Sequence, residues 1–359
     1  MHGRHAGHWT RAALNPPRAH GAPLPLAELK ALPDDFHVEE QLSFAPSGGG
    51  PHWLLRVEKR NANTRWIAAE IARLAQVPSA AIGYAGLKDR RAVTVQWFSV
   101  PALATTADHW SAVRTAEFRV LEVQRNARKL KRGALTGNRF RIRLRNAAWS
   151  REQLDLKLSA LRAHGVPNYF GPQRFGREGY NLDRVAAWAK SGQPPRDRAQ
   201  RGFALSAARS LIFNAVLARR VEAGNWSQLS PGDLASLEGS GSHFHVTALD
   251  DDILRRSMAL DIHPSGPLWG RGDPETQGHA LALECEVAGE FQDVAKLLAG
   301  EGLTQERRPL RSVVSDLTLE ADAGTITLGF TLGRGQFATS VVREICELGS
   351  TRELESDED

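Results

Sequence analysis

The sequence predicts an α+β fold, because its strands and helices follow one another without a regular repeat. Two segments, residues 139–145 and 326–332, alternate apolar and polar residues, which predicts strands with one buried face. Residues 154–161 carry leucines at helical spacing, which predicts an amphipathic helix. The irregular order argues against a TIM barrel or a doubly wound sheet, and a chain of 359 residues predicts about two domains.

In the N-terminal half, a proline-containing lead-in is expected over residues 15–32, followed by an alternating segment of Phe36, Val38 and Glu40. Strands are expected over residues 52–58 and 94–100. Between them, a helix is expected to begin at a cap formed by Asn63 or Thr64 and to run to about residue 76.

The clearest strand is residues 139–145, which read Arg-Phe-Arg-Ile-Arg-Leu-Arg. Phe140, Ile142 and Leu144 share one face, and the four arginines share the other. Asn138 has the same parity as Phe140. If the strand begins there, Asn138 faces the apolar side and can sit at the mouth of a cleft.

In the C-terminal half, Gly165 is expected to end the leucine-containing helix, and another helix is expected over residues 206–222. Residues 225–300 are expected to alternate short strands and loops, with one helix near the end. After the strand over residues 326–332, Thr339 or Ser340 is expected to cap a short helix.

The composition indicates a soluble globular protein, with 42% hydrophobic and 24% charged residues and a net charge of +5. No stretch is long and apolar enough to predict a membrane-spanning helix.

Cys285 and Cys346 are far apart, so they are expected to be buried, reduced thiols. The histidine-rich N-terminus lacks an apolar signal region, so a cytoplasmic protein is expected. His243 and His245 could be two metal ligands, but without a third ligand a structural role is favoured.

Several motifs that hold cofactors or catalytic groups do not occur. There is no GxGxxG, GxxxxGK[ST], HExxH or GxSxG, so a nucleotide cofactor, a zinc protease site and a serine hydrolase elbow lack support.

Residues 125–145 hold nine cations and no acid, so their local charge exceeds that of the whole chain. Such a segment fits the phosphate backbone of a nucleic acid; the alternative is a solvated loop and a solvent-facing strand. Aromatic residues nearby could stack on unpaired bases, although each, taken singly, is more often a core residue. The candidates for backbone contacts are Arg125, Arg128, Lys129, Lys131 and Arg132.

Residues 82–100 combine small residues with a short charged run. Gly83, Ala85 and Gly86 permit close approach of the backbone. Asp89 follows among Lys88, Arg90 and Arg91, and opposite charge favours an ionised carboxylate that could act as nucleophile or base. The alternative is a surface cluster of salt bridges.

The sequence resembles the TruD family of tRNA pseudouridine synthases. The family's motifs occur in order between residues 28 and 348: LKALPDDFHVEE (29–40), NANTRW (61–66), AGLKDRRAVTVQWFS (85–99), KLKRGALTGNRF (129–140), GVPNYFGPQRFG (165–176), LSAARSLIFN (205–214) and GQFATSVVRE (335–344).

The resemblance implies isomerisation of uridine to pseudouridine at position 13 of tRNA, without a cofactor or a required metal. It implies that Asp89 is the nucleophile and that Phe36, Asn138 and Phe337 bind the substrate. Lys30 matches a family position and is expected to pair with Asp89 without being catalytic. Four residues between positions 169 and 174 mark a domain junction: Tyr169, Phe170, Gln173 and Arg174. They could have a structural role or contact RNA.

The resemblance also implies a pseudouridine-synthase catalytic domain with a mixed, mainly antiparallel, bent sheet and helices. Residues 28–163 and 312–350 would form it, with an α/β TRUD domain inserted over residues 164–311. Residues 1–27 are expected to be a flexible basic arm and residues 351–359 an acidic tail. The expected partner is tRNA, with no membrane or protein partner and a monomeric state. The alternatives are a catalytically silent RNA-binding protein or chaperone on the same scaffold, and an RNA methyltransferase, which should carry a glycine-rich cofactor loop.

Overall fold

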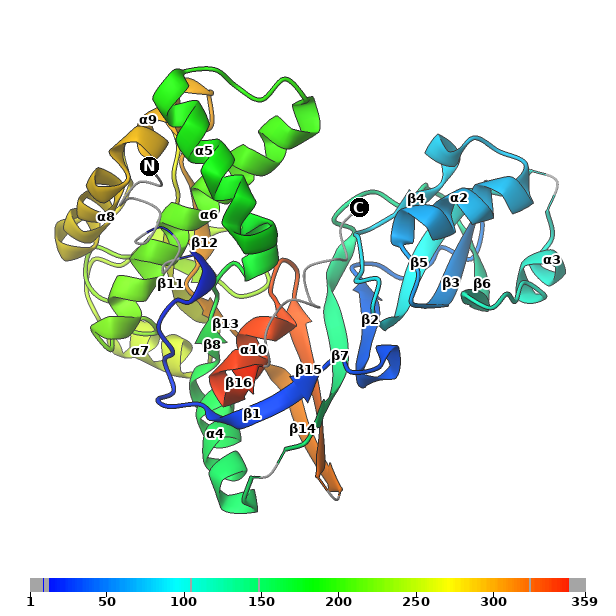
Figure 1. Ribbon diagram of the computed structural model, residues 1–359, viewed down its shortest axis with the longest axis horizontal. Coiled ribbons are helices and arrows are strands. Elements are labelled where there is room, and N and C mark those ends of the chain that lie inside the picture. The colour runs from blue at the N-terminus through cyan, green and yellow to red at the C-terminus, as the bar shows by residue number, and fades with distance from the viewer. Residues whose placement is uncertain (1–8, 10–12, 104, 148, 323, 349–359) are drawn as a thin grey trace. The chain divides into compact units, whose positions relative to one another are not determined.

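The computed structural model describes residue 9 and residues 13–103, 105–147, 149–322 and 324–348 (Figure 1). The expected acidic tail and most of the first twelve residues lie outside these ranges. The chain forms two compact units. Unit 1 comprises residues 1–24, 151–314 and 336–345, and unit 2 comprises residues 25–150, 315–335 and 346–359. The domain boundaries expected at residues 164 and 311 stay a prediction.

Unit 2 is built on a mixed sheet that the described residues form with ten strands. Seven of them lie in the order β14-β15-β7-β2-β5-β3-β6, β1 lies between β7 and β16, and β4 pairs with β5. The pair β2–β5 is parallel and the other pairs of known register are antiparallel. The strands are β1 (Leu24–Leu29), β2 (Phe36–Leu42), β3 (His52–Arg60), β4 (Gly83–Tyr84), β5 (Val93–Pro101), β6 (Phe118–Asn126), β7 (Leu135–Arg145), β14 (Ser315–Asp322), β15 (Thr325–Gly333) and β16 (Cys346–Leu348).

Helix α2 (Thr64–Ala75) covers one face of this sheet (Figure 1). Asn63 caps the helix by accepting a hydrogen bond from the Arg65 amide, as the sequence predicts. Ile67 and Ile71 are fully buried on the helix side that packs against β3 and β5. A short helix, α3 (Ala107–Ser111), completes the unit. The period of the apolar residues therefore identified both the helix and its buried face.

Strand β7 confirms the alternation read from the sequence. Phe140, Ile142 and Leu144 are buried, whereas the arginines between them are exposed or half-buried. The strand begins before Asn138, at Leu135, so Asn138 lies inside it with the parity of Phe140. β15 pairs with β7 along its length and places Phe330 opposite Phe140, where the two rings stack at 5.4 Å.

Unit 1 is mainly helical around α6, whose central residues are buried on most sides. Its helices are α4 (Arg151–His164), α5 (Tyr180–Ser191), α6 (Arg198–Glu222), α7 (Asp251–Met258), α8 (Gly278–Glu290), α9 (Gln292–Gly300) and α10 (Ala338–Ile345). Its strands are β8 (Val166–Pro167), β9 (Leu234–Leu237), β10 (His243–His245), β11 (Ile262–Leu268), β12 (Glu306–Pro309) and β13 (Arg311–Ser312). Gly165 ends α4 with a φ of 68°, as predicted.

Some predictions for unit 1 are wrong. Residues 225–300 contain three helices rather than one. The buried face of α8 includes Glu284, which pairs with Arg307, and a charged residue there conceals the apolar period. Helix α10 begins at Ala338, so Thr339 and Ser340 lie within it instead of capping it. Cys285 is exposed, whereas Cys346 is buried as expected, and neither cysteine forms a disulfide within the described residues.

The described part of the expected N-terminal arm is folded against unit 1. Ala13 is buried in the core of that unit. The Ala19 and His20 amides donate to Glu344 Oε2 at 3.0 and 3.1 Å, and Lys157 Nζ donates to the His20 carbonyl. A flexible arm over residues 13–24 is therefore wrong. Among the residues that the structure describes, no helix combines the length and apolar character needed to cross a membrane.

Candidate active site

Asp89 lies in the irregular segment between β4 and β5, with its carboxylate open to solvent. Its side chain is 42% exposed, and Oδ2 lies 2.9 Å from Lys30 Nζ. The buried side chain of Lys59, on β3, donates to the Asp89 carbonyl at 2.8 Å and to the Ala62 carbonyl at 2.7 Å. The backbone of Asp89 is therefore anchored by one cation while its carboxylate is held by another.

The cation that pairs with Asp89 is not one of its sequence neighbours. Lys88 turns to the opposite side and binds Glu40 Oε2 at 2.6 Å, where both side chains are buried. The other oxygen of Glu40 accepts the Trp97 amide at 3.2 Å. The expected ring of adjacent cations around Asp89 is wrong at Lys88, because the buried carboxylate of Glu40 binds the Lys88 side chain.

The Asp89 segment is tied down by α2 and β5. Thr64, the first residue of α2, accepts the Lys88 amide at 3.1 Å and donates to Gln96 Oε1 at 2.9 Å. Gln96 in turn donates to the Gly86 carbonyl. Gly83 allows a close approach, because a Cβ there would lie 2.3 Å from the Leu130 carbonyl oxygen. These contacts hold the segment in one arrangement.

Lys30 has a left-handed backbone, with a φ of 57°, immediately after β1. Such a conformation costs a non-glycine residue roughly 1–2 kcal/mol and is often retained at functional sites. The side chain is nearly buried, and its Nζ lies 4.2 Å from the centre of the Phe36 ring. The Lys30 cation therefore contacts both the carboxylate of Asp89 and the ring of Phe36, which is expected to bind the substrate.

Phe36 and Asn138 lie on neighbouring strands and on one face of the sheet. In the β2–β7 register, Phe36 is opposite Ile142 and Glu40 is opposite Asn138, and directly opposed residues share a face. The rings of Phe36 and Phe140 meet edge to face at 6.1 Å. This arrangement places Asn138 beside the Glu40–Lys88 pair.

The side-chain oxygen of Asn138 is buried and has no hydrogen-bond partner within the described part of the chain. A buried acceptor without a partner loses its hydration without compensation, so such atoms are uncommon and often face a ligand. A donor on a bound nucleotide would satisfy it. Unit 2 thus joins Asp89 and Phe36 through Lys30 and carries Asn138 on the same sheet face as Phe36.

Phe337 belongs to unit 1, where its half-buried ring packs against Phe170 at 6.2 Å. Its expected contact with the base stays a prediction. Of the junction residues, Tyr169 and Phe170 are buried in the core of unit 1, and burial raises the pKa of the Tyr169 hydroxyl well above its ordinary value. Arg174 donates to Ser206 Oγ at 2.9 Å. These contacts favour a structural role.

The basic loop, residues 127–134, lies beside the segment that carries Asp89. The Gly133 amide donates to the Ala85 carbonyl at 2.8 Å, and the Leu130 amide donates to Ser99 Oγ. Arg128 and Lys131 are exposed and have no ion pair with any residue that the structure describes. A positive loop next to an accessible carboxylate is suited to hold a phosphate backbone near that carboxylate.

The other expected backbone candidates rest on neighbouring groups of unit 2. Arg125 lies over the Trp53 ring at 4.5 Å and Arg132 over the Tyr84 ring at 3.8 Å. Lys129 Nζ donates to the Ala80 carbonyl at 2.5 Å. Stacked and hydrogen-bonded cations of this kind are partly ordered before any ligand binds.

The arginines of β7 face away from Phe36 and Asn138, and two of them have acidic partners distant in sequence. Arg145 binds Asp35 through two hydrogen bonds of 2.9 and 2.7 Å, which raise the pKa of Arg145 above its ordinary value. Arg141 lies 3.1 Å from Glu320. The local sequence contains no acid to balance these arginines, but acidic residues from other parts of the chain balance two of them.

Within the described ranges, no group of three or more His, Cys, Asp or Glu side chains is placed to hold a metal ion. His243 Nε2 lies 3.3 Å from Glu275. Sequence reasoning did not assign a role to Glu40 or Lys59. Glu40 could have been noticed, because it has the parity of Phe36 and Val38 and so is an acid on an apolar face.

Comparisons with known proteins agree along nearly the whole chain. A family model described as TruD, tRNA pseudouridine synthase D, matches residues 25–193 and 197–345. The tRNA pseudouridine synthase D of Nitrosococcus oceani is 46% identical over 90% of this chain and 91% of its own. That of Methylococcus capsulatus is 46% identical over 92% and 94%. A crystal structure of a TruD protein from Methanosarcina mazei matches with a TM-score of 0.73 at 21% identity, over 93% and 96% of the two chains, which confirms the α+β fold.

Proposed function

We propose, from the premise that this chain belongs to the TruD family of tRNA pseudouridine synthases, that it isomerises uridine to pseudouridine at position 13 of tRNA. One observation about the site supports the proposal most directly. An accessible carboxylate, that of Asp89, is held 2.9 Å from the buried Lys30 cation beside the Phe36 ring. The adjacent basic loop supplies the positive charge that a tRNA backbone requires.

The reaction rearranges bonds within one nucleotide. The bond between N1 and C1′ breaks, a bond between C5 and C1′ forms, N1 gains a proton and C5 loses one. No oxidant or reductant is consumed. The uracil must therefore detach, rotate and reattach while it is held out of the stack of bases.

Asp89 is the proposed nucleophile. An ionised carboxylate can add to C6 of the base, attack C1′, or remove a sugar proton to promote elimination to a glycal. Each route needs the carboxylate near the extruded nucleotide. The ion pair with Lys30 orients the carboxylate. Phenylalanine at position 337 cannot titrate, so the proton on C5 leaves through another group.

Phe36 and Asn138 are the proposed substrate contacts of unit 2, and Phe337 that of unit 1. The unpaired Asn138 oxygen accepts a hydrogen bond from the base or the ribose. The basic loop binds the phosphate backbone, with the exposed cations Arg128 and Lys131 as its main contacts. The protein is proposed to work in the cytoplasm as a monomer, where its two cysteines remain reduced.

The test is Asp89→Asn, compared with Asp34→Asn as a control. Asp34 is an exposed aspartate of unit 2 that pairs with Arg60 and not with Lys30. Tritium release from tRNA labelled at C5 of uridine should vanish for Asp89→Asn and persist for Asp34→Asn. Both variants should bind tRNA with a Kd within about twofold of the unaltered protein.

Two results would contradict the proposal. Tritium release from Asp89→Asn at a rate comparable to the control would remove the nucleophile assignment. Tight tRNA binding by the unaltered protein without any tritium release would favour a silent RNA-binding protein. Incubation with S-adenosylmethionine and tRNA should give no methylated product.

A further inference from the structure

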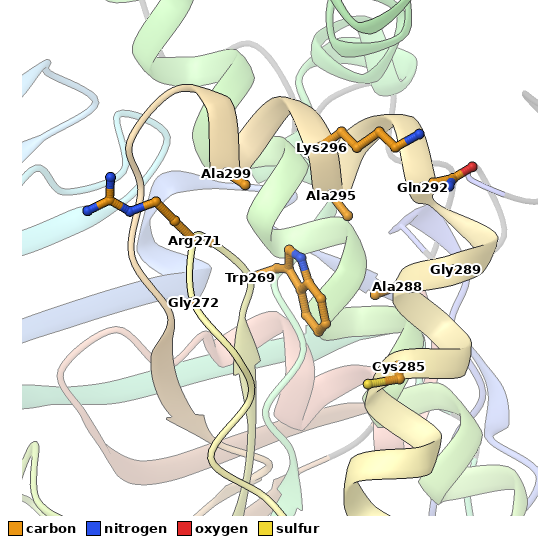
Figure 2. A pocket seen from close by; sticks show the side chains of 11 residues that line it. Trp269, Arg271, Gly272, Cys285, Ala288, Gly289, Gln292, Ala295, Lys296 and Ala299 are labelled. Atoms are coloured by element: carbon orange, nitrogen blue, oxygen red, sulfur yellow. The ribbon is translucent and has the colours of Figure 1, made fainter.

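Unit 1 contains a hollow of about 410 Å³ that the proposed chemistry does not use (Figure 2). It lies between residues 269–272, which follow β11, and the facing sides of α8 and α9. Its volume is in the range of sites that hold small molecules or single nucleotides. It contains none of the residues that the family resemblance assigns to the substrate.

The hollow has an aromatic floor. The indole of Trp269 stands between the loop and the two helices (Figure 2). The opposite wall carries small side chains where it faces the indole, at Cys285, Ala288, Gly289 and Ala295. A flat ring can therefore lie against Trp269 without displacing a protein side chain.

Trp269 is held in place from both sides along the chain. The Leu268 carbonyl accepts a hydrogen bond of 2.6 Å from Arg209. Gly270 packs so closely against the next segment that a Cβ there would lie 2.3 Å from the Leu303 carbonyl oxygen. The ring is also packed against the core of unit 1. A pre-positioned ring loses little freedom when a ligand stacks on it.

The rim of the hollow is positive. Arg271 and Lys296 are exposed and lie on either side of Trp269 (Figure 2), and no lining residue is acidic. Two acids of α8, Glu286 and Glu290, face Arg219 instead. An apolar ligand would gain nothing from this rim, whereas a phosphate on each side of a stacked base would meet a cation.

We propose that this hollow binds one unstacked nucleotide of the tRNA, at a second contact separate from Asp89. The base stacks on Trp269, its flanking phosphates meet Arg271 and Lys296, and the exposed amide of Gln292 can hydrogen-bond the base edge. This inference rests on the proposed function, because it takes tRNA as the substrate.

The test blocks the hollow without cutting into the core. Gly289→Leu adds a side chain where a Cβ meets no atom within 4 Å, and Gly202→Leu makes the same change at an equally open helical position of α6. Both are made in Asp89→Asn, so that turnover does not interfere. We expect Gly289→Leu to raise the Kd for tRNA about tenfold and Gly202→Leu to leave it within about twofold. Equal thermal melting of the two would show that both fold.

The cations are tested by salt dependence. Arg271→Gln and Lys296→Gln should each lower the slope of log affinity against log salt by about one, whereas Lys190→Gln, an exposed lysine of α5, should not. Trp269→Phe should retain most of the affinity that Trp269→Leu loses, because stacking needs a ring.

The outcomes separate this inference from the proposed function. If Asp89→Asn binds tRNA and Gly289→Leu and Gly202→Leu then behave alike, the hollow is not an RNA contact and the isomerase proposal stands. If the unaltered protein binds no tRNA, the proposed function fails. Binding of free 5′-UMP that Gly289→Leu abolishes, with tRNA binding unchanged, would assign the hollow to a free nucleotide and overturn the inference.

Discussion

The buried ion pair beside the proposed nucleophile should be important for both stability and activity. Glu40 and Lys88 are 0% and 6% exposed and meet at 2.6 Å, and Glu40 also accepts the Trp97 amide. Glu40→Gln keeps the shape but leaves the Lys88 cation buried without a counter-charge. Breaking a buried pair in this way typically costs about 3–5 kcal/mol. Since glutamine retains part of the hydrogen bonding, the lower end, about 3 kcal/mol, is expected.

The assay is urea unfolding, with Glu320→Gln as the matched control on the same sheet. Glu320 pairs with Arg141 at 3.1 Å, but the two side chains are 71% and 54% exposed, so its loss should cost less than about 1 kcal/mol. The double variant Glu40→Gln with Lys88→Met should recover most of the loss, because it removes both charges. Equal losses for Glu40→Gln and Glu320→Gln would refute the reasoning.

Activity should fall with stability in this variant. Lys88 is the residue before Asp89, so a repositioned Lys88 displaces the carboxylate. At a temperature where Glu40→Gln is folded, we expect tritium release to slow at least tenfold with tRNA affinity little changed, since a small misplacement of a catalytic group is costly. A larger effect on tRNA affinity than on turnover would contradict this.

The remaining predictions concern three other parts of the chain. Lys30→Met should reduce tritium release strongly while tRNA binding persists, measured as for Asp89→Asn. Arg128→Gln with Lys131→Gln should lower the salt slope of tRNA binding by about two, in a salt titration. Burial lowers the pKa of His20 below 6.5, although the hydrogen bond to the Gly165 carbonyl and the charge of Glu344 oppose this shift. The unfolded chain therefore takes up that proton first, so stability should fall as the pH drops below about 6.5, less so in His20→Asn, in unfolding experiments at pH 7.5 and 5.5.

Sequence patterns predicted those elements whose environment is uniform along their length. β7 and β15 each have one buried face, so their alternation was visible. Helix α2 has a cap and one apolar stripe. Where a buried face contains a charge, as at Glu284 in α8, the pattern failed, because its partner Arg307 is distant in sequence.

The same limit applies to the site. Family motifs pointed to Asp89, Phe36 and Asn138, and the parity of β7 independently placed Asn138. The local sequence could not show that Lys30 rather than Lys88 pairs with Asp89. That pairing depends on a contact across 59 positions, which the fold creates and the spacing of residues does not encode.

The two lysine–carboxylate pairs of this site differ in a way that fits their proposed roles. Glu40–Lys88 is buried, so breaking it exposes an uncompensated charge, and it acts as a fixed support. Lys30 is nearly buried, but its partner Asp89 is 42% exposed, and a pair open to water is worth much less. The Asp89 carboxylate can therefore leave Lys30 for a substrate atom at a small cost in free energy. A nucleophile needs that freedom, and it would be lost if the chain had paired Asp89 with its buried neighbour instead.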